Sequence, residues 1–306
     1  AQGNLALVAR YASDFETAVS QAEVVIAAHP KYATAYVGLA LSHLALGDSQ
    51  AAKQTYRTLA DISAFGASLA AAGLADLALY EGRLDDAAEI LERAATTDLE
   101  NGDRAAGGRK LITLADAEFL RGRPEEAIAT AGRAVEESQQ DPVLFEAALV
   151  YLGAGYQQEA MELATRIEGR LAPEPRAYAK LIEGEIALAG SEPARAVALF
   201  SEAQAILDTW IGRLALGRAY LESDAFPEAH AEFENALQRR GEATSVFCDD
   251  RPTYHHLPPV HYWLGRALEG LGSHAAAESY RTFVDIKANS DVDPLAAAVR
   301  QRLGDL

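Results

Sequence analysis

The chain contains 306 residues, with 27 Lys and Arg against 45 Asp and Glu, which gives a formal net charge of −18 at pH 7. This acidic balance argues against a nucleic-acid-binding protein, which needs Lys and Arg to displace counterions from phosphates, and against general adhesion to anionic lipid. A hydrophobic fraction of 49% is sufficient for a folded core. The single cysteine excludes an internal disulfide and a multi-cysteine metal site, and no apolar stretch is long enough to span a bilayer.

A repeated pattern of small and apolar residues runs along the chain and predicts successive helical hairpins. A turn residue is followed by Ala, then by an apolar or small residue four positions later and by Ala three further on, as in Gly82, Ala87, Leu91 and Ala94. These positions share one helix face, so a second helix can pack against a first one. In chain order, the predicted hairpins cover residues 2–32, 33–66, 68–98, 108–140, 141–174, 177–207, 210–238 and 258–290.

Capping residues and prolines mark where the second helices are expected to begin. Asp48 is placed to cap the second helix of the hairpin at 33–66, because its carboxylate can accept from backbone N–H groups that have no helical partner. Pro124, Pro193 and Pro227 stand at the expected first positions of later second helices, where a missing N–H is tolerated.

Two segments interrupt the repeat. Residues 98–107 are long and polar, and we expect them to lengthen a turn or the start of a helix. Residues 239–257 form an irregular insert. After the last hairpin, Asp293 and Pro294 predict the start of a capping helix over 293–303, which would cover the apolar face of the terminal repeat.

The clearest repeat reads Leu216-Gly217-Arg218-Ala219-Tyr220 and is followed by Ala229, Phe233 and Ala236. This spacing resembles the tetratricopeptide repeat, a helix–turn–helix unit of about 34 residues. The resemblance covers nearly the whole chain and implies one domain over 1–306, an all-α, right-handed superhelical solenoid of about eight hairpins. The stretch 238–268 further resembles the last part of bacterial repeat arrays linked to kinase or winged-helix regulatory domains.

A stack of such hairpins leaves a concave face that is lined by the first helix of each repeat. The repeat alignment places acidic residues in its N-terminal and central part, apolar residues beside them and basic residues at its C-terminal end. We expect this groove to bind an extended or helical peptide with apolar anchors and opposite charge polarity; an alternative for the apolar positions is packing against neighbouring helices. The candidate binding residues are Asp76, Ile112, Asp116, Phe145, Leu181, Glu185, Arg218, Tyr262 and Arg266, and Val37, Leu41 and Ala72 are expected to face the same groove.

One kind of binding site known in the family that this chain resembles is not expected here. Members that clamp the C-terminal carboxylate of a chaperone tail use Lys and Asn on neighbouring first helices. In this chain Asp76 and Asp116 would repel a carboxylate, and the aligned positions offer few cations. We therefore do not expect a clamp of that kind.

No nucleotide-binding loop, zinc-protease helix, serine-hydrolase motif or kinase signature occurs in the sequence. Six potential metal ligands do stand within fourteen residues: Cys248, Asp249, Asp250, His255, His256 and His261. Their spacing matches no established ligand pattern. We interpret them as a polar loop and a helix start, we expect no metal or cofactor, and we keep a metal-assisted hydrolase as an alternative.

We therefore predict a non-enzymatic interaction module that binds a protein, a peptide or a fused domain of its parent chain. The alternative is a regulatory or sensor region of a larger bacterial signalling protein that carries a kinase or transcription-regulator domain. We expect no nucleic-acid partner and no membrane insertion, and self-association stays open because the end faces of solenoids stack. The chain begins at Ala1 without a signal-peptide pattern, which suggests a fragment that is cytoplasmic by default and extracytoplasmic if a transmembrane helix precedes it.

Overall fold

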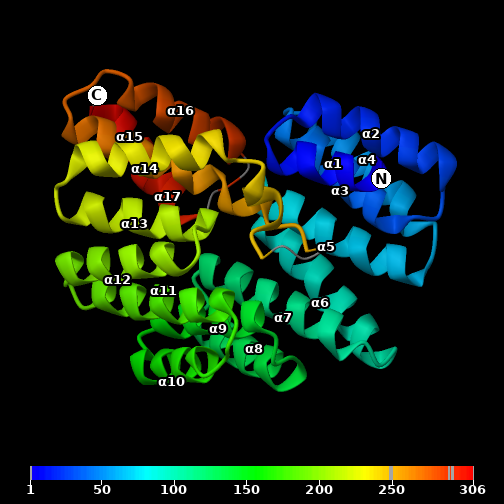
Figure 1. Ribbon diagram of the computed structural model, residues 1–306, viewed down its shortest axis with the longest axis horizontal. Helices are drawn as coiled ribbons and strands as arrows, with labels where there is room; N and C mark the ends of the chain where they lie inside the picture. Colours follow the sequence, from blue (N-terminus) through cyan, green and yellow to red (C-terminus); the bar gives the residue numbers. More distant parts are fainter. Residues whose placement is uncertain (1, 248–250, 289, 291–292, 306) are drawn as a thin grey trace.

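The computed structural model describes residues 2–247, 251–288, 290 and 293–305. Every regular element within these residues is a helix, which confirms the all-α class (Figure 1). Helices α1 to α16 pair in chain order into antiparallel hairpins, and α17 follows the last hairpin. Among the described residues, no helix combines the length and the hydropathy that a transmembrane segment needs.

The N-terminal half of the array consists of α1 (Gln2–Tyr11), α2 (Phe15–Ala28), α3 (Ala33–Ala45), α4 (Ser49–Ala60), α5 (Ala64–Tyr80), α6 (Leu84–Glu100), α7 (Arg104–Leu120) and α8 (Pro124–Glu137). The next three hairpins consist of α9 (Asp141–Gly153), α10 (Gln157–Glu168), α11 (Pro173–Ala189), α12 (Pro193–Ile206), α13 (Trp210–Glu222) and α14 (Phe226–Gln238). The insert carries two short 3₁₀ helices, and the C-terminal part is helical again: η1 (Glu242–Ser245), η2 (Tyr254–His256), α15 (Pro258–Gly270), α16 (Ala276–Ile286) and α17 (Pro294–Asp305).

Each hairpin turns at one residue in the left-handed backbone region. In the α5–α6 turn this residue is Gly82 (φ 79°), whose N–H donates to the carbonyl of Leu79, while the N–H of Arg83 donates to the carbonyl of Ala78. These bonds satisfy the last carbonyl groups of the first helix and end it. The equivalent residues of the other turns are Ser13, Gly47, Gly122, Gly155, Ser191, Asp224 and Gly272.

Aromatic side chains of the second helices lie directly on glycines of the first helices. A Cβ atom added to Gly184 of α11 would lie 2.2 Å from the ring of Phe200, and one added to Gly217 of α13 would lie 2.7 Å from the ring of Phe233. Both phenylalanines are fully buried. Glycine at these positions therefore lets the two helices of a hairpin approach closely. A larger residue there would collide with the ring.

Residues 98–107, expected to lengthen a turn or the start of a helix, are mostly helical. Helices α6 and α7 extend into this segment from both sides and leave a three-residue turn. Asp103 caps α7 by accepting from the backbone N–H of Ala106 at 2.9 Å. Asp98 and Lys110 form a buried ion pair between the two lengthened helices. The polar composition thus reflects a cap and a buried pair rather than a loop.

The hydrophobic core continues from α3 to α15 and includes Phe247 and Tyr254 of the insert. A smaller core joins α15, α16 and α17, where Val299 packs with Tyr280 and Phe283. The insert therefore belongs to the interior of the array, whereas α17 covers the last hairpin.

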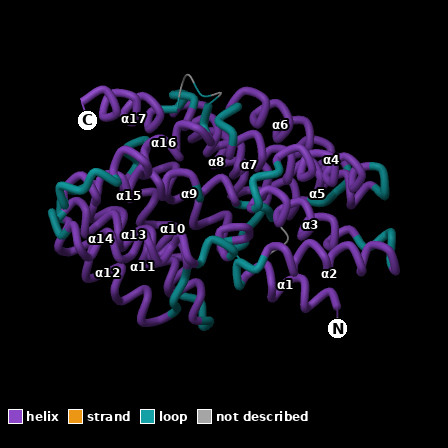
Figure 2. Tube along the Cα trace, turned by 90° about the horizontal axis from the view of Figure 1, so that it is seen from above, coloured by secondary structure: helices purple, strands orange, loops and turns teal. Residues whose placement is uncertain are grey.

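The solenoid curves into a nearly closed ring, in which α14 to α16 come back opposite α1 to α4 (Figure 1). The insert crosses the interior of this ring, with η1 in contact with α1 and α13, and η2 in contact with α5 and α15. Seen from above, the two chain ends lie at opposite sides of the molecule (Figure 2). The concave face and the insert that crosses it are therefore where a binding site is expected.

Candidate functional site: the concave face and its insert

The insert covers the central part of the concave face with aromatic side chains. The ring of Phe247 has its centroid 6.0 Å from that of Phe145 in α9 and 5.8 Å from that of Tyr178 in α11. Tyr254 stacks on Tyr80 of α5, with centroids 5.5 Å apart. Since Phe247 and Tyr254 are buried, this part of the concave face is closed by the chain itself.

Acidic residues of α5 and α7 face a histidine of the insert. Oδ1 of Asp76 accepts from the backbone N–H of His255 at 3.0 Å and lies 2.7 Å from Nδ1 of the same residue. The other ring nitrogen, Nε2, lies 3.9 Å from Oδ2 of Asp116. The structure thus brings two of the predicted site residues together, and the insert occupies the space between them.

Burial controls the protonation of this group. Desolvation raises the pKa of Asp76 to about 7 and lowers the pKa of His255 to about 3, and nearby cations lower the pKa of His255 further. Burial and the neighbouring Glu146 carboxylate raise the pKa of Asp116 to about 6. Since Asp76 and His255 share a short contact, they titrate as a pair that takes up its first proton close to neutral pH.

Two side chains fix the internal fold of the insert and its contact with α9. Oγ1 of Thr253 accepts from the backbone N–H of Val246 at 2.8 Å, which joins the two described parts of the insert. The guanidinium of Arg251 pairs with the carboxylate of Glu146 and lies over the ring of Phe247, 4.8 Å from its centroid. Arg251 is therefore held in one position by a charge and by an aromatic face.

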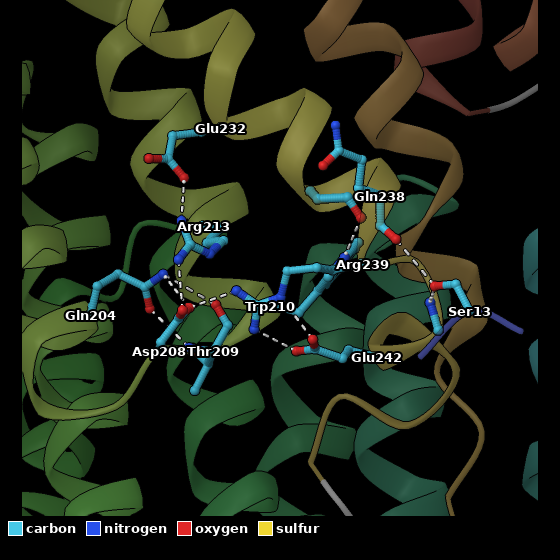
Figure 3. Close-up of polar contacts among 12 residues, drawn as sticks. Ser13, Gln204, Asp208, Thr209, Trp210, Arg213, Glu232, Gln238, Arg239 and Glu242 are labelled. Carbon is cyan, nitrogen blue, oxygen red and sulfur yellow. Dashed lines mark hydrogen bonds and ion pairs between the residues drawn. The ribbon is translucent and has the colours of Figure 1, made fainter. Parts of the chain in front are cut away.

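The start of the insert is tied to the turn between α12 and α13 by an ion network (Figure 3). Nη1 of Arg239 donates to Oδ1 of Asp208 at 2.8 Å, and Nε of Arg239 donates to Oε1 of Glu242 at 2.7 Å. Asp208 also accepts from Arg213 at 2.6 Å. These charge-assisted bonds set the direction in which the chain leaves α14.

The same end of the insert packs against the first hairpin. The backbone N–H of Gly241 donates to Oγ of Ser13 at 2.9 Å, and Nη1 of Arg10 donates to Oγ1 of Thr244 at 2.6 Å. A Cβ atom on Gly241 would lie 2.1 Å from the carbonyl oxygen of Arg10. Only glycine fits at this approach of two backbones.

A second contact closes the ring after α16. Nζ of Lys287 donates to the carbonyl of Leu79 in α5 at 2.8 Å and lies 3.5 Å from Oδ2 of Asp293. Ser290 packs beside the α5–α6 turn, where a Cβ atom on Gly82 would lie 2.6 Å from the Cβ of Ser290. The C-terminal part of the array is therefore attached to the third hairpin.

The apolar candidates of the groove are buried. Ile112, Phe145 and Leu181 belong to the main core, and Tyr262 packs against Tyr280 in the smaller core. Adjacent repeat helices and the insert cover these side chains, so they stabilise the array and offer no surface to a ligand in this structure. This corrects the expectation that they face an open groove.

The remaining charged candidates are paired with other residues of the array. Glu185 of α11 and Arg218 of α13 lie 2.8 Å apart, and Arg218 also lies over the ring of Trp263 at 5.5 Å. Arg266 pairs with Glu222 at 3.0 Å. These residues do not join Asp76 and Asp116 in one site, so the acid-to-base polarity expected along the groove is offset by ion pairs within the chain.

An open cavity lies at the N-terminal end of the concave face. Its volume is about 570 Å³, and its walls come from α1, α2, α3, α5, α6, α7 and the edge of the insert. The expected groove positions Val37, Leu41 and Ala72 line it. Large apolar side chains that line the cavity also remain exposed: Phe65 (56%), Tyr32 (50%) and Leu7 (44%).

Basic residues surround this cavity, and the repeat alignment missed them. They are Arg10, Arg109, Lys110 and Arg251. Nζ of Lys110 is held 2.8 Å from Oγ of Ser68 and pairs with Asp98, and burial lowers the pKa of Lys110. A signal was present in the sequence, because Lys110 shares a helix face with Ala106 and Leu114, where a charged residue is unusual.

The candidate metal ligands of the insert fall into two groups. Cys248, Asp249 and Asp250 lie outside the described residues. The imidazole of His255 contacts Asp76, the ring of His256 is tilted against it with the centroids 4.1 Å apart, and burial lowers the pKa of His261 to about 4. In the part of the chain that the structure describes, no three His, Cys, Asp or Glu side chains are grouped as a metal ion would require.

Residues 4–67 and 72–142 match the family model of the tetratricopeptide repeat. These two segments are therefore similar to tetratricopeptide repeats, and repeats of this kind are in general protein–protein interaction modules. A sequence comparison with curated proteins finds no match.

Solved structures share the architecture at low sequence identity. Human IFIT1, in its dimer with m7Gppp-AAAA, is 17% identical with a TM-score of 0.55, over 99% of this chain and 71% of that one. A chain of the APC/C hetero-tetramer Cut9–Hcn1 is 14% identical with a TM-score of 0.51, over 97% of this chain and 54% of that one, so this chain spans about half of its length. These likenesses concern the fold alone.

Proposed function

We propose that this array of tetratricopeptide repeats binds a peptide segment of a partner protein in the cavity at the N-terminal end of its concave face. Proteins built from these repeats bind protein or peptide partners. The observation that carries the proposal is the division of the concave face: the insert covers its centre, whereas the surface between α1, α3, α5 and α7 stays open.

The apolar lining of the cavity supports a peptide ligand. Phe65, Tyr32 and Leu7 keep about half of their surface exposed, and they lie close to the buried groove residues Val37 and Leu41. Soluble proteins rarely expose neighbouring large apolar side chains without a partner to cover them. An amphipathic segment would cover these side chains with its apolar face.

The size of the cavity supports a local contact rather than a peptide that runs along the whole array. Its volume of about 570 Å³ lies within the range of about 300–1,000 Å³ that is typical of ligand sites. Further along the concave face, Phe145 and Leu181 are buried. The proposal therefore places the apolar anchors of the partner on the first four hairpins.

The test selects peptides from a display library against the whole chain and measures their affinities by isothermal titration calorimetry. Phe65→Ala and Leu7→Ala remove exposed side chains that line the cavity. Each is expected to weaken binding about tenfold or more, because burying such a side chain contributes about 1.5–3 kcal/mol and about 1.4 kcal/mol is a tenfold change in affinity.

Matched controls are available outside the cavity. Tyr156→Ala and Leu171→Ala also remove exposed apolar side chains (45% and 98% exposed), and neither residue lines the cavity. We expect both variants to bind the selected peptides as the unmodified chain does. The proposal fails if no peptide is selected, or if Phe65→Ala and Leu7→Ala leave the affinities unchanged.

A further inference from the structure

We propose that the partner segment is acidic and that it contacts the insert as well as the repeat helices. This inference rests on the proposed function and adds the chemistry of the partner. It follows from the charge of the cavity, from the origin of its basic residues and from the position of the acidic residues that were expected to face the groove.

The cavity is opposite in charge to the chain as a whole. The chain has 45 acidic against 27 basic residues, yet among the described residues Arg10, Arg109, Lys110 and Arg251 line the cavity together with one acidic residue, Asp103, and the carboxylates that pair with Lys110 and Arg251 (Asp98 and Glu146) do not line it. A concave surface with low-dielectric walls concentrates the field of such charges. In an acidic protein, a basic cavity with apolar walls selects a ligand that carries negative charge beside apolar groups.

Contacts within the chain hold the basic residues of α7 in place. Nζ of Lys110 is fixed by Ser68 and by Asp98, which offsets its charge. The guanidinium of Arg109, one position earlier, donates to the neutral side-chain oxygen of Gln140 at 3.0 Å, so this contact positions Arg109 without offsetting its charge. Arg109 is therefore the residue of α7 most suited to meet a carboxylate of the partner.

The insert supplies one wall of the cavity through Ser245, Arg251 and Pro252. Arg251 is oriented by the ring of Phe247 and by Glu146, which offsets its charge as Asp98 offsets that of Lys110. The basic residues thus come from α1, α7 and the insert, which are three separate elements. This distribution suits a segment with several acidic side chains better than a single carboxylate at a chain end.

The acidic residues expected in the groove do not oppose such a partner. Asp76 and Asp116 are directed toward His255, and neither lines the cavity. The repulsion that the repeat alignment suggests for a carboxylate is therefore absent from the open part of the concave face.

The test uses designed amphipathic peptides that share their Leu and Phe positions and carry Glu, Gln or Lys at the spacer positions. All are acetylated and amidated, and one further Gln peptide keeps a free C-terminal carboxylate. Titration calorimetry with the full chain measures their affinities at low and at high salt. We expect the Glu peptide to bind about tenfold tighter than the Gln peptide and to lose this advantage at high salt.

A pair of charge-reversal variants identifies the site. Arg109→Glu reverses a cation that lines the cavity, and Arg133→Glu reverses an exposed cation of α8 that does not line it. Both change the net charge of the chain by the same amount. We expect Arg109→Glu to weaken binding of the Glu peptide about tenfold and Arg133→Glu to leave it unchanged.

The outcomes separate this inference from the proposed function. Binding of the Gln or Lys peptide as tight as that of the Glu peptide overturns the acidic partner and leaves the proposed function standing. Equal binding by the Gln peptide with a free carboxylate overturns the segment with several acidic side chains in favour of a chain end. If none of the peptides binds, both proposals are overturned.

Discussion

His255 and Asp76 are 179 positions apart in the chain, yet the backbone nitrogen and Nδ1 of His255 both approach one oxygen of Asp76, at 3.0 and 2.7 Å. Asp76 belongs to α5 and His255 to the insert between α14 and α15. One buried carboxylate therefore connects the N-terminal hairpins to a segment that follows the seventh hairpin, and it helps to hold the insert in the concave face.

The first prediction concerns the acceptor oxygen of Asp76. Asp76→Ala leaves the backbone N–H of His255 buried without its acceptor and removes the oxygen that Nδ1 of His255 contacts, and we expect a loss of about 2 to 4 kcal/mol in the free energy of unfolding. Asp76→Asn keeps an acceptor oxygen at the same place and should cost less than about half of that. Urea unfolding of the two variants measures the difference, and equal losses would contradict the role given to this oxygen.

A comparison of the unmodified chain with Asp76→Asn also gives a prediction for the pH dependence of stability. Burial raises the pKa of Asp76 from 3.8 to about 7, so the folded chain binds a proton there that the unfolded chain does not. The contribution of Asp76 to stability is therefore full below pH 4 and is lost as the pH rises through 7. Relative to Asp76→Asn, the unmodified chain should lose stability as the pH rises from 5 to 7, with a slope of up to about 1.4 kcal/mol per unit; a difference that does not depend on pH would contradict the raised pKa.

The second prediction concerns the backbone approach at the start of the insert. In Gly241→Ala the added Cβ would lie 2.1 Å from the carbonyl oxygen of Arg10 and 2.8 Å from the nitrogen of Ser13. Neither atom can move without displacing the first hairpin, so we expect a loss of about 2 kcal/mol or more. Chemical denaturation measures this loss.

A glycine without such an approach serves as its control. A Cβ atom on Gly132, inside α8, would meet only the hydroxyl of Tyr151 at 3.6 Å. Gly132→Ala is therefore expected to stabilise the chain by about 0.5–1 kcal/mol through the higher helix propensity of alanine. A Gly241→Ala variant that is as stable as the unmodified chain would show that the insert does not pack on the first hairpin in solution.

The third prediction concerns acid stability. Burial lowers the pKa of His261 from 6.5 to about 4. Between these values the unfolded chain binds a proton on this residue and the folded chain does not, so its contribution to stability is lost as the pH falls from 6.5 toward 4, by up to about 1.4 kcal/mol per unit. His261→Gln should reduce this loss, as measured by urea midpoints over the acid range, and the exposed His274→Gln serves as the control. Equal acid dependence in all three proteins would refute the prediction.

The fourth prediction uses the left-handed turn residues. Ser191 occupies the turn of the α11–α12 hairpin with φ 59°, where a residue with a side chain loses about 1–2 kcal/mol. Ser191→Gly removes this strain, and after the greater flexibility of glycine in the unfolded chain is subtracted, we expect a gain of about 0.5–1 kcal/mol. At the equivalent Gly122 (φ 73°), the reverse change Gly122→Ala should cost about 1 kcal/mol. Thermal or urea unfolding tests both, and effects of the opposite sign would contradict the strain argument.

The hairpins are predictable from the sequence because each one depends on residues close together in the chain. Gly217 and Phe233, for example, stand sixteen positions apart, and their close packing needs only one turn between two helices. The same spacing recurs along the chain, which is why an all-α solenoid follows from one sequence. The polar segment 98–107 lengthens the start of α7, one of the two outcomes expected for it, and its polar residues supply a helix cap and a buried ion pair.

The candidate site was predictable only in part. The repeat alignment places Val37, Leu41 and Ala72 on the concave face, and these residues line the open cavity. It also places Phe145 there, which the structure shows covered by Phe247 of the insert. The insert has no repeat spacing of its own, so no local pattern indicates which first helices it meets.

By itself, the sequence determined a stack of close helical hairpins, since the packing of each hairpin follows from helix periodicity and small residues within one repeat. Only the tertiary structure decided which part of the concave face is open and that this part is basic. The physical reason is that the curvature of a solenoid accumulates over many repeats, so contacts such as His255 with Asp76 and Lys287 with Leu79 depend on the whole array rather than on any single segment.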